Sequence, residues 1–286
     1  MAQAGFSHIE GPSIVGPATA INGAWGLTSG YLPWLAPTVV AARGHYLYVY
    51  DQGRRHIYRY DLARQVVTSF LDFTHGPVAG MAVGADMSLY VADAGAGHVQ
   101  HIAADGRVLP TLSNEFDLGR PVAVSLDERT GRVWVADSLN NQLAVFNSMG
   151  GLMTTLKSDE LHSTVAMAWG PDGVYIVDRV SRQVVVLGQN GAMRYTLGEG
   201  TLKMPAGIAV DRFNRVFVID SFDDTIKIYE QGQLVQVLGS GEASRPFRGL
   251  ASIWIDQSTL YLADTMNARI VSFRLISPRL REHLDE

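Results

Sequence analysis

The sequence predicts an all-β protein built from six copies of one unit, and two observations support this prediction. An aspartate that closes a short β-rich run returns every 41 to 44 residues, and a further β-rich run begins about six residues after it. A period of about 40–45 residues with several strands per unit is typical of one blade of a β-propeller. We therefore predict a six-bladed β-propeller of four-stranded antiparallel blades. The six aspartates are Asp51, Asp93, Asp137, Asp178, Asp220 and Asp264.

The fifth repeat shows the four expected strands most clearly. Residues 208–211 form a short inner strand, and the Ala and Gly residues around it suit the crowded centre of a ring. Turns of Gly, Asp or other polar residues then separate expected strands over residues 216–220, 225–229 and 233–238. The middle strands are apolar on both faces, which is expected of a sheet packed between two neighbouring blades.

The chain is expected to fold as a single domain over residues 1–286. The sixth repeat offers only three strands, the last ending at Leu275, and a charged, helix-like tail follows. Residues 6–15 contain a spare strand, so we predict that an N-terminal strand completes the last blade and closes the ring. Deletion of residues 1–16 should then lower the melting temperature. The predicted blades span residues 38–71, 77–112, 120–157, 163–197, 205–239 and 249–275.

The order of motifs within each unit resembles the NHL repeat. The unit begins with a Pro-Gly lead, followed by an aliphatic-Ala-Val-Asp strand and a Tyr-Val-Ala-Asp strand, and it ends with Ser-x-Asn and an Ile-rich strand. Residues 136–143 and 263–270 match this pattern best. Residues 52–55, 94–97 and 179–182 depart from the pattern after the aspartate. The resemblance covers about four-fifths of the chain. It implies the fold rather than an activity, because the motif belongs to the scaffold.

The repeating aspartate is interpreted as structural. A catalytic site places a few residues asymmetrically around a reacting centre, whereas this aspartate is present in every blade. We expect its carboxylate to accept backbone N–H bonds from the following turn. The alternative is a ring of six carboxylates in the channel, but the position at the end of the second strand lies one layer out from the centre.

The lead-in loop before the first strand and the turn between strands two and three lie on one side of each blade, called here the top face. The tip of that turn, two residues after the aspartate, is usually Gly in the NHL pattern, as in Gly53 and Gly95. Exposed apolar patches on soluble proteins tend to be contacts, so apolar tips predict a partner-binding surface. The alternative is that each tip folds back onto a neighbouring lead-in loop. Four blades carry such tips, the apolar arc: Leu139, Val180, Phe222 and Met266.

Five of the six lead-in loops place a His, Arg or Lys near the mouth of the channel. Such a ring suits a small anion, a phosphate or an acidic loop of a partner. The alternative is a solvated rim, partly neutralised by nearby acidic residues. Those acidic residues are Glu115, Asp117, Asp159, Glu160 and Glu242. The predicted partner-binding residues of these loops are Trp34, Phe247, Arg120 and Arg248.

The same resemblance in fold extends to enzymes, among them an amidating lyase and lactonases that hold a metal in the channel. His75 and His162 occupy equivalent lead-in positions two blades apart, but no third matching His exists. His56 and His98 begin third strands and are interpreted as structural. We therefore predict no cofactor, with a divalent metal near His75 and His162 as the alternative. No Ser-His-Asp arrangement, phosphate loop or paired-carboxylate motif stands out.

Composition limits the remaining classes. The net charge of −5 gives no drive toward nucleic acid, and the absence of cysteine excludes disulfides and thiolate chemistry. No segment reaches the roughly 18 apolar residues of a membrane span. The first five residues lack the features of a signal peptide. We favour an exported bacterial protein whose leader has been removed, with a cytosolic protein as the alternative, and we expect a monomer outside any larger complex.

The sequence thus favours a non-enzymatic scaffold that binds a protein or peptide partner on its top face. The first alternative is a metal-dependent enzyme of the lyase or lactonase type, with its site at the channel mouth. The second is an RNA-binding propeller, which some NHL domains are, although the acidic lead-in loops and Asp223 and Asp224 oppose it.

Overall fold

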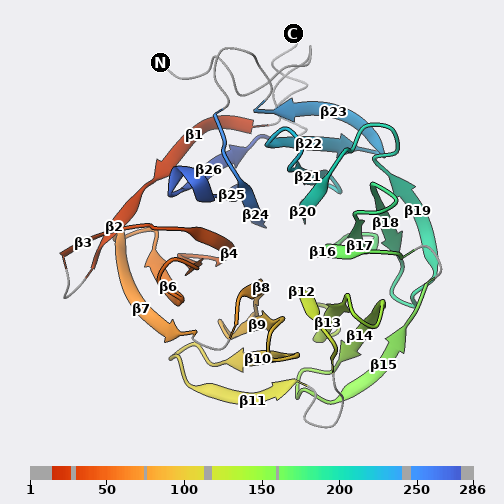
Figure 1. The fold of residues 1–286 in the computed structure, drawn as a ribbon, viewed down its shortest axis with the longest axis horizontal. Coiled ribbons are helices and arrows are strands. Elements are labelled where there is room, and N and C mark those ends of the chain that lie inside the picture. The colour runs from red at the N-terminus through yellow and green to blue at the C-terminus, as the bar shows by residue number, and fades with distance from the viewer. Residues whose placement is uncertain are drawn as a thin grey trace.

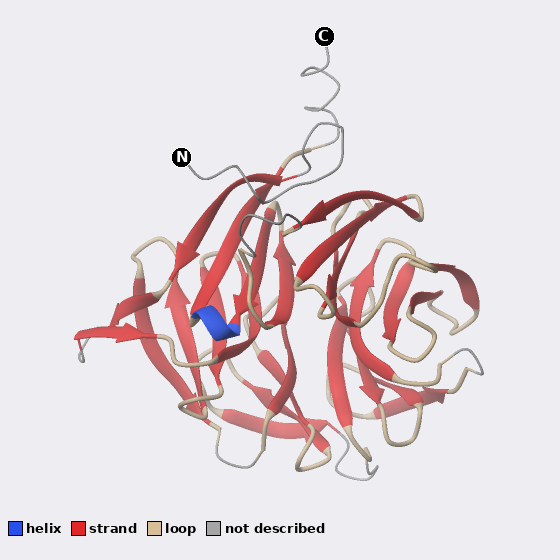
Figure 2. Cartoon of the chain, turned by 45° about the horizontal axis from the view of Figure 1, so that its top comes forward, coloured by secondary structure: helices blue, strands red, loops and turns tan. Residues whose placement is uncertain are grey.

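The computed structural model describes residues 15–26, 30–73, 76–112, 118–158, 161–239 and 246–277. Its strands form six sheets that succeed one another around a central axis as the chain proceeds (Figure 1). The helix found within the described part is a single 3₁₀ turn, η1 (Thr265–Asn267), on the rim of the last blade (Figure 2). The predicted fold class, a six-bladed β-propeller of antiparallel blades, is confirmed.

Each blade orders its strands from the centre outward. The innermost strands are β4 (Pro37–Arg43), β8 (Val78–Val83), β12 (Pro121–Asp127), β16 (Thr164–Gly170), β20 (Pro205–Val210) and β24 (Leu250–Asp256). The second strands are β5 (Tyr46–Asp51), β9 (Leu89–Asp93), β13 (Arg132–Asp137), β17 (Gly173–Asp178), β21 (Val216–Asp220) and β25 (Thr259–Asp264). The third strands are β6 (His56–Asp61), β10 (His98–Ile102), β14 (Gln142–Phe146), β18 (Gln183–Leu187), β22 (Thr225–Glu230) and β26 (Arg269–Leu275). The outer strands are β7 (Val66–Asp72), β11 (Val108–Leu112), β15 (Leu152–Leu156), β19 (Met193–Leu197), β23 (Gln233–Leu238) and, in the last blade, β1 (Val15–Ile21).

The hydrophobic core is divided into six clusters, one at each interface between neighbouring blades. Every residue of β9, β17 and β21 is buried, although successive side chains of a strand point to opposite faces. Both faces of each blade are therefore packed against a neighbour, which explains why the second strands read as continuous apolar runs.

The ring is closed by the N-terminal strand, as predicted. Strand β1 pairs antiparallel with β26, from Val15 opposite Leu275 to Ile21 opposite Ile270. It lies further along the chain than the predicted strand over residues 6–15, of which residues 6–14 fall outside the described part. The last blade thus combines strands from both ends of the sequence.

Blade 1 carries a hairpin that the sequence did not predict. Strands β2 (Gly23–Gly26) and β3 (Gly30–Pro33) pair with each other, and β2 runs parallel to β7, with Trp25 opposite Val66. Both are four residues long and rich in glycine, so they show no period of hydrophobic residues. The hairpin makes blade 1 a six-stranded sheet, with β3 and β2 outside β7 (Figure 1).

The top-face turn shares one backbone feature in all six blades. The fourth residue after the repeating aspartate has a positive φ between 49° and 69° each time, although only one of the six is Gly. Those residues are Arg55, Gly97, Asn141, Arg182, Asp224 and Ala268. Because L-residues rarely adopt a positive φ, its recurrence shows that the turns keep this left-handed residue even where the NHL-like sequence is lost.

Within the described ranges, no helix is long and apolar enough to cross a membrane.

Candidate binding surface and channel

Among the described residues, five of the six repeating aspartates accept hydrogen bonds from the lead-in loop of their own blade, and Asp93 accepts them from its top-face turn. All six are fully buried. The carboxylate of Asp220 accepts N–H bonds from Lys203 and Met204 of the lead-in loop at 2.8 and 2.9 Å, and from Phe222 of the turn at 3.1 Å. Asp137 likewise accepts bonds from the lead-in residues Gly119 and Arg120, and Asp178 from His162, Ser163 and Ser181. The expected backbone N–H bonds from the following turn are present at Asp93, Asp137, Asp178 and Asp220. Asp51 and Asp264 instead accept bonds from turn side chains, those of Arg54 and Asn267. The sequence missed the bonds to the lead-in loop.

These bonds make the stability of the protein dependent on pH. Burial by itself raises the pKa of Asp137, Asp178 and Asp220, but the hydrogen bonds outweigh it and hold each pKa below its ordinary value. The stabilisation is therefore complete above the unfolded-state pKa of about 3.9 and is lost as the pH falls through the lower folded-state pKa. We expect the melting temperature, followed by circular dichroism, to fall steeply below about pH 4. A melting temperature that stays constant from pH 5 to pH 2.5 contradicts this role.

The apolar arc is exposed as predicted. Leu139, Val180, Phe222 and Met266 keep between 63% and 72% of their surface accessible. Two of them, Leu139 and Met266, also lie against the lead-in loop of their own blade. A Cβ at Gly119 would come within 2.9 Å of Leu139, and one at Gly249 within 2.9 Å of Met266. These two tips therefore rest on their lead-in loops without being covered by them.

Cationic residues accompany the arc. Lys203 Nζ lies 4.5 Å from the ring centroid of Phe222, in cation–π geometry. Arg120, His162 and Arg248 are also exposed on the lead-in loops of the other three blades that carry the arc. The top face thus combines apolar tips with adjacent basic side chains over blades 3 to 6, whereas blades 1 and 2 have glycine tips.

Two of the predicted contact residues are corrected. Trp34 is 2% exposed and Phe247 is 0% exposed. The Trp34 indole donates a hydrogen bond to the Ile21 carbonyl at 3.1 Å, and the Phe247 ring packs against Phe273. Both rings belong to the core between blades, where they anchor the lead-in loops, so they do not lie on the surface offered to a partner.

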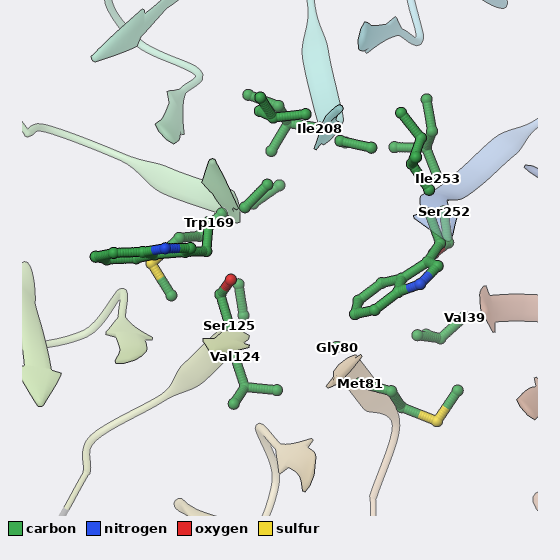
Figure 3. Close-up of a pocket in the computed structure, with 18 of the residues that line it drawn as sticks. Val39, Gly80, Met81, Val124, Ser125, Trp169, Ile208, Ser252 and Ile253 are labelled. Atoms are coloured by element: carbon green, nitrogen blue, oxygen red, sulfur yellow. The ribbon is translucent and has the colours of Figure 1, made fainter. Parts of the chain in front are cut away.

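A channel of about 580 Å³ runs along the axis and is lined by the six innermost strands. Figure 3 shows labelled side chains from each of these strands around it, among them Trp169, Met81 and Ile208. The walls are apolar apart from the hydroxyls of Ser125 and Ser252 and two charged residues at one end, Glu128 and Arg129. Volume and lining fit a site for a small, largely apolar molecule.

Side chains of β24 form hydrogen bonds with backbone groups on the channel-facing edge of β4. Each innermost strand is the last in its sheet, so one edge has no strand partner. The Val40 N–H donates to Ser252 Oγ at 3.2 Å, and the Trp254 indole donates to the Ala42 carbonyl at 2.8 Å. Trp254 also packs against the core clusters of blades 1 to 3, so it reaches across the ring.

An ion pair bridges blades 1 and 3 at the opposite, bottom end of the channel. The Arg43 guanidinium donates to both oxygens of Glu128. This hydrogen bond raises the pKa of Arg43, while burial raises the pKa of the neighbouring Asp256, which accepts the Gly44 N–H. Neither the apolar arc nor the basic lead-in loops predicted from the sequence includes this bottom end of the channel. The ion pair of Arg43 with Glu128 could not be predicted, because 85 positions separate the two residues in the sequence.

Of the two predicted metal ligands, His162 alone belongs to the described part of the chain. His162 is exposed on its lead-in loop, and His75 lies outside the described residues. Among the described side chains, no group of three His, Cys, Asp or Glu residues could hold a metal ion. Glu128 is the carboxylate residue among those that line the channel, and it forms an ion pair with Arg43.

A Ser-His-Asp group that the sequence did not reveal lies on the rim of blade 1. His56 Nδ1 is 2.6 Å from Asp72 Oδ1, and Ser69 Oγ is 2.8 Å from His56 Nε2. The spacing of these residues along the chain matches no known motif, because their proximity depends on the register between β6 and β7.

The chain is similar in fold to several solved structures. No protein-family model matches the sequence, and no curated protein matches it. Virginiamycin B lyase from Staphylococcus aureus aligns with a TM-score of 0.67 at 12% identity, covering 91% of this chain and 99% of that one. A Bacteroides thetaiotaomicron protein of unknown function gives 0.69 at 16% identity, over 91% and 76% of the two chains. A chain of a nidogen/laminin complex gives 0.67 at 18% identity, over 80% and 92%. The shared feature is the β-propeller fold. At these identities the likeness shows nothing further.

Proposed function

We propose that this propeller is a binding scaffold whose top face engages a protein or peptide partner. The observation that carries the proposal is the apolar arc, because four adjacent turns each present an apolar side chain to solvent. Aromatic, Met and Arg side chains are enriched in protein interfaces, and Phe222, Met266, Arg120 and Arg248 supply them here.

The regularity of the turns supports the same proposal. The six turns share a positive-φ residue at the same position, and the aspartates of the four blades that carry the arc tie their turns to the lead-in loops. The tips are thus held on a rigid frame, which lowers the entropy lost on binding. The similar chain in the nidogen/laminin complex is an example of this fold in a protein assembly.

The test is a pair of charge substitutions on the arc. The partner is first captured from native extract with the wild-type chain and then purified, and its Kd is measured by calorimetry. We expect Phe222→Asp with Val180→Asp to weaken binding by roughly 30-fold or more, as loss of hot-spot residues does. The melting temperature should change little, because both side chains are exposed.

The matched control is Met149→Asp, which charges a side chain that is 89% exposed but lies outside the arc. It should leave the Kd unchanged. Equal binding by the double variant and the wild type refutes a contact at the arc.

The enzymatic alternative is supported by the shared fold with streptogramin lyases, which carries over no site residue at 12% identity. Metal analysis of the purified chain distinguishes a metal-dependent lyase or lactonase from a scaffold. For RNA binding, a shift assay at increasing salt is decisive, because phosphate contacts make affinity fall with salt.

A further inference from the structure

Blade 1 contains a hydrogen-bonded chain of a hydroxyl, an imidazole and a carboxylate. Ser69 Oγ lies 2.8 Å from His56 Nε2, and His56 Nδ1 lies 2.6 Å from Asp72 Oδ1. An ionised carboxylate can only accept, so the proton between His56 and Asp72 belongs to Nδ1. In the neutral imidazole Nε2 then accepts the proton of the Ser69 hydroxyl. This connectivity of nucleophile, base and orienting carboxylate is that of serine hydrolases.

His56 departs from the structural role of its position in the repeat. Five residues after the aspartate, Gln142 donates to Asp137 at 3.3 Å and Arg269 donates to Asp264 at 2.7 Å. These side chains reinforce the buried carboxylates of their own blades. His56 instead uses both ring nitrogens on the outer strand, where its partners are Ser69 and Asp72.

A β-bulge places the serine on the same face as the imidazole. Asp72 is opposite His56 and Ser69 is opposite Tyr58, with the register shift between residues 57 and 58. Without the extra residue, Phe70 would face Tyr58 and Ser69 would point to the other side. In blades 3, 4 and 5 the equivalent shift comes two residues later along the third strand, at residues 145/146, 186/187 and 228/229.

The surroundings hold the imidazole and leave the hydroxyl open. His56 is 8% exposed, and its ring lies 4.4 Å from that of Tyr58, which contacts Trp34 in turn. Ser69 and Asp72 are exposed. The base is therefore fixed by packing, while the nucleophile faces solvent on the rim.

The β2–β3 hairpin, which among the described residues occurs in blade 1 alone, borders this group. Strand β2 pairs with β7 at Val66 and Val67, and beyond Val67 the outer edge of β7 has no strand partner in the described ranges. Backbone N–H groups on such an edge are available to hydrogen-bond a carbonyl oxygen as negative charge develops on it.

We propose that Ser69, His56 and Asp72 form an acyl-transfer site that hydrolyses carboxylic esters. Ser69 Oγ bonds to the ester carbonyl carbon while His56 Nε2 takes the hydroxyl proton. The tetrahedral adduct collapses, its bond to the alcohol oxygen breaks, and His56 gives that oxygen the proton. Water then attacks the acyl-Ser69 with His56 as base, which releases the carboxylic acid and restores the hydroxyl. This activity adds to the binding role and uses a different surface.

The test measures serine reactivity in the full chain. A fluorophosphonate probe should modify Ser69, located by peptide mass spectrometry, and p-nitrophenyl acetate should be hydrolysed. Ser69→Ala should abolish both signals. His56→Gln should slow both by about 100-fold or more, the usual contribution of a general base. Asp72→Asn should lower the rates of labelling and hydrolysis by only about five- to tenfold, because this carboxylate is exposed and its charge is screened by solvent.

Controls separate reactivity from folding. His56→Gln introduces the residue that blades 3 and 4 carry at Gln142 and Gln183, so the melting temperature should be retained. Ser138→Ala, which removes a hydroxyl bound to the Arg120 carbonyl, should leave labelling unchanged. The proposal is overturned if wild-type Ser69 is not labelled, or is labelled equally fast in His56→Gln.

Discussion

Deletion of residues 1–21 is expected to lower the melting temperature by more than 10 °C. Strand β1 is the outer strand of the last blade, and Val15 packs in the cluster that contains Phe273 and Leu275. Exposure of these side chains costs about 1.5–3 kcal/mol each, on the order of 5 kcal/mol or more in sum. At roughly 2–4 °C per kcal/mol for a domain of this size, the shift is easily measured by calorimetry.

The matched control for this deletion is a chain that begins at Ser13 and keeps all of β1. Its melting temperature should be close to that of the full chain. The deletion of residues 1–16 suggested by the sequence removes only Val15 and Gly16 from β1 and should have a smaller effect. If the chain without residues 1–21 melts like the full chain, β1 does not close the ring.

Replacement of Asp220 by Ala is expected to destabilise the protein by about 3–5 kcal/mol, roughly 10 °C in melting temperature. The carboxylate is fully buried, and the Lys227 ammonium that donates to it is itself only 7% exposed. Its removal leaves the buried Lys227 ammonium with only the Asp223 carboxylate, 4.0 Å away, as a counterion, and three backbone N–H groups without their acceptor. Thermal unfolding monitored by circular dichroism measures the loss.

A double-mutant cycle shows which part of this loss comes from the charge. Asp220→Asn with Lys227→Met removes both charges, so it should be less destabilising than the sum of the two single changes. Asp105→Ala is the control, since Asp105 also accepts a backbone N–H in a turn but is exposed. It should leave the melt nearly unchanged. A loss for Asp220→Ala no larger than that for Asp105→Ala contradicts the proposed fastening role.

Much of the fold could be predicted because the repeat is regular. The spacing of the aspartates gives the number of blades, and the three-stranded last repeat predicts closure by the N-terminus. The β2–β3 hairpin could not be predicted, since its strands are short and Gly-rich and form by pairing with β7. Such pairing is decided by tertiary context rather than by local pattern.

The candidate sites were predicted less completely, because a sequence position does not give the direction of a side chain. Tip positions such as Leu139 are exposed in any such turn, so the apolar arc was predictable. Trp34 and Phe247 belong to lead-in loops of the same top face, yet their rings point into the core. The contact of His56 with Ser69 depends on a one-residue bulge, which leaves no local pattern in the sequence.

The pairing of β1 with β26 also has a consequence for the order of folding. Ile21 and Ile270 are neighbours across this ladder although about 250 residues separate them. During synthesis, the first five blades can form one after another from contiguous segments, but the sixth must wait until the ribosome has delivered the end of the repeat region. Closing so long a loop costs entropy that only the final contacts repay. Until then β1 is a strand without its partner, and the nascent chain carries an open ring.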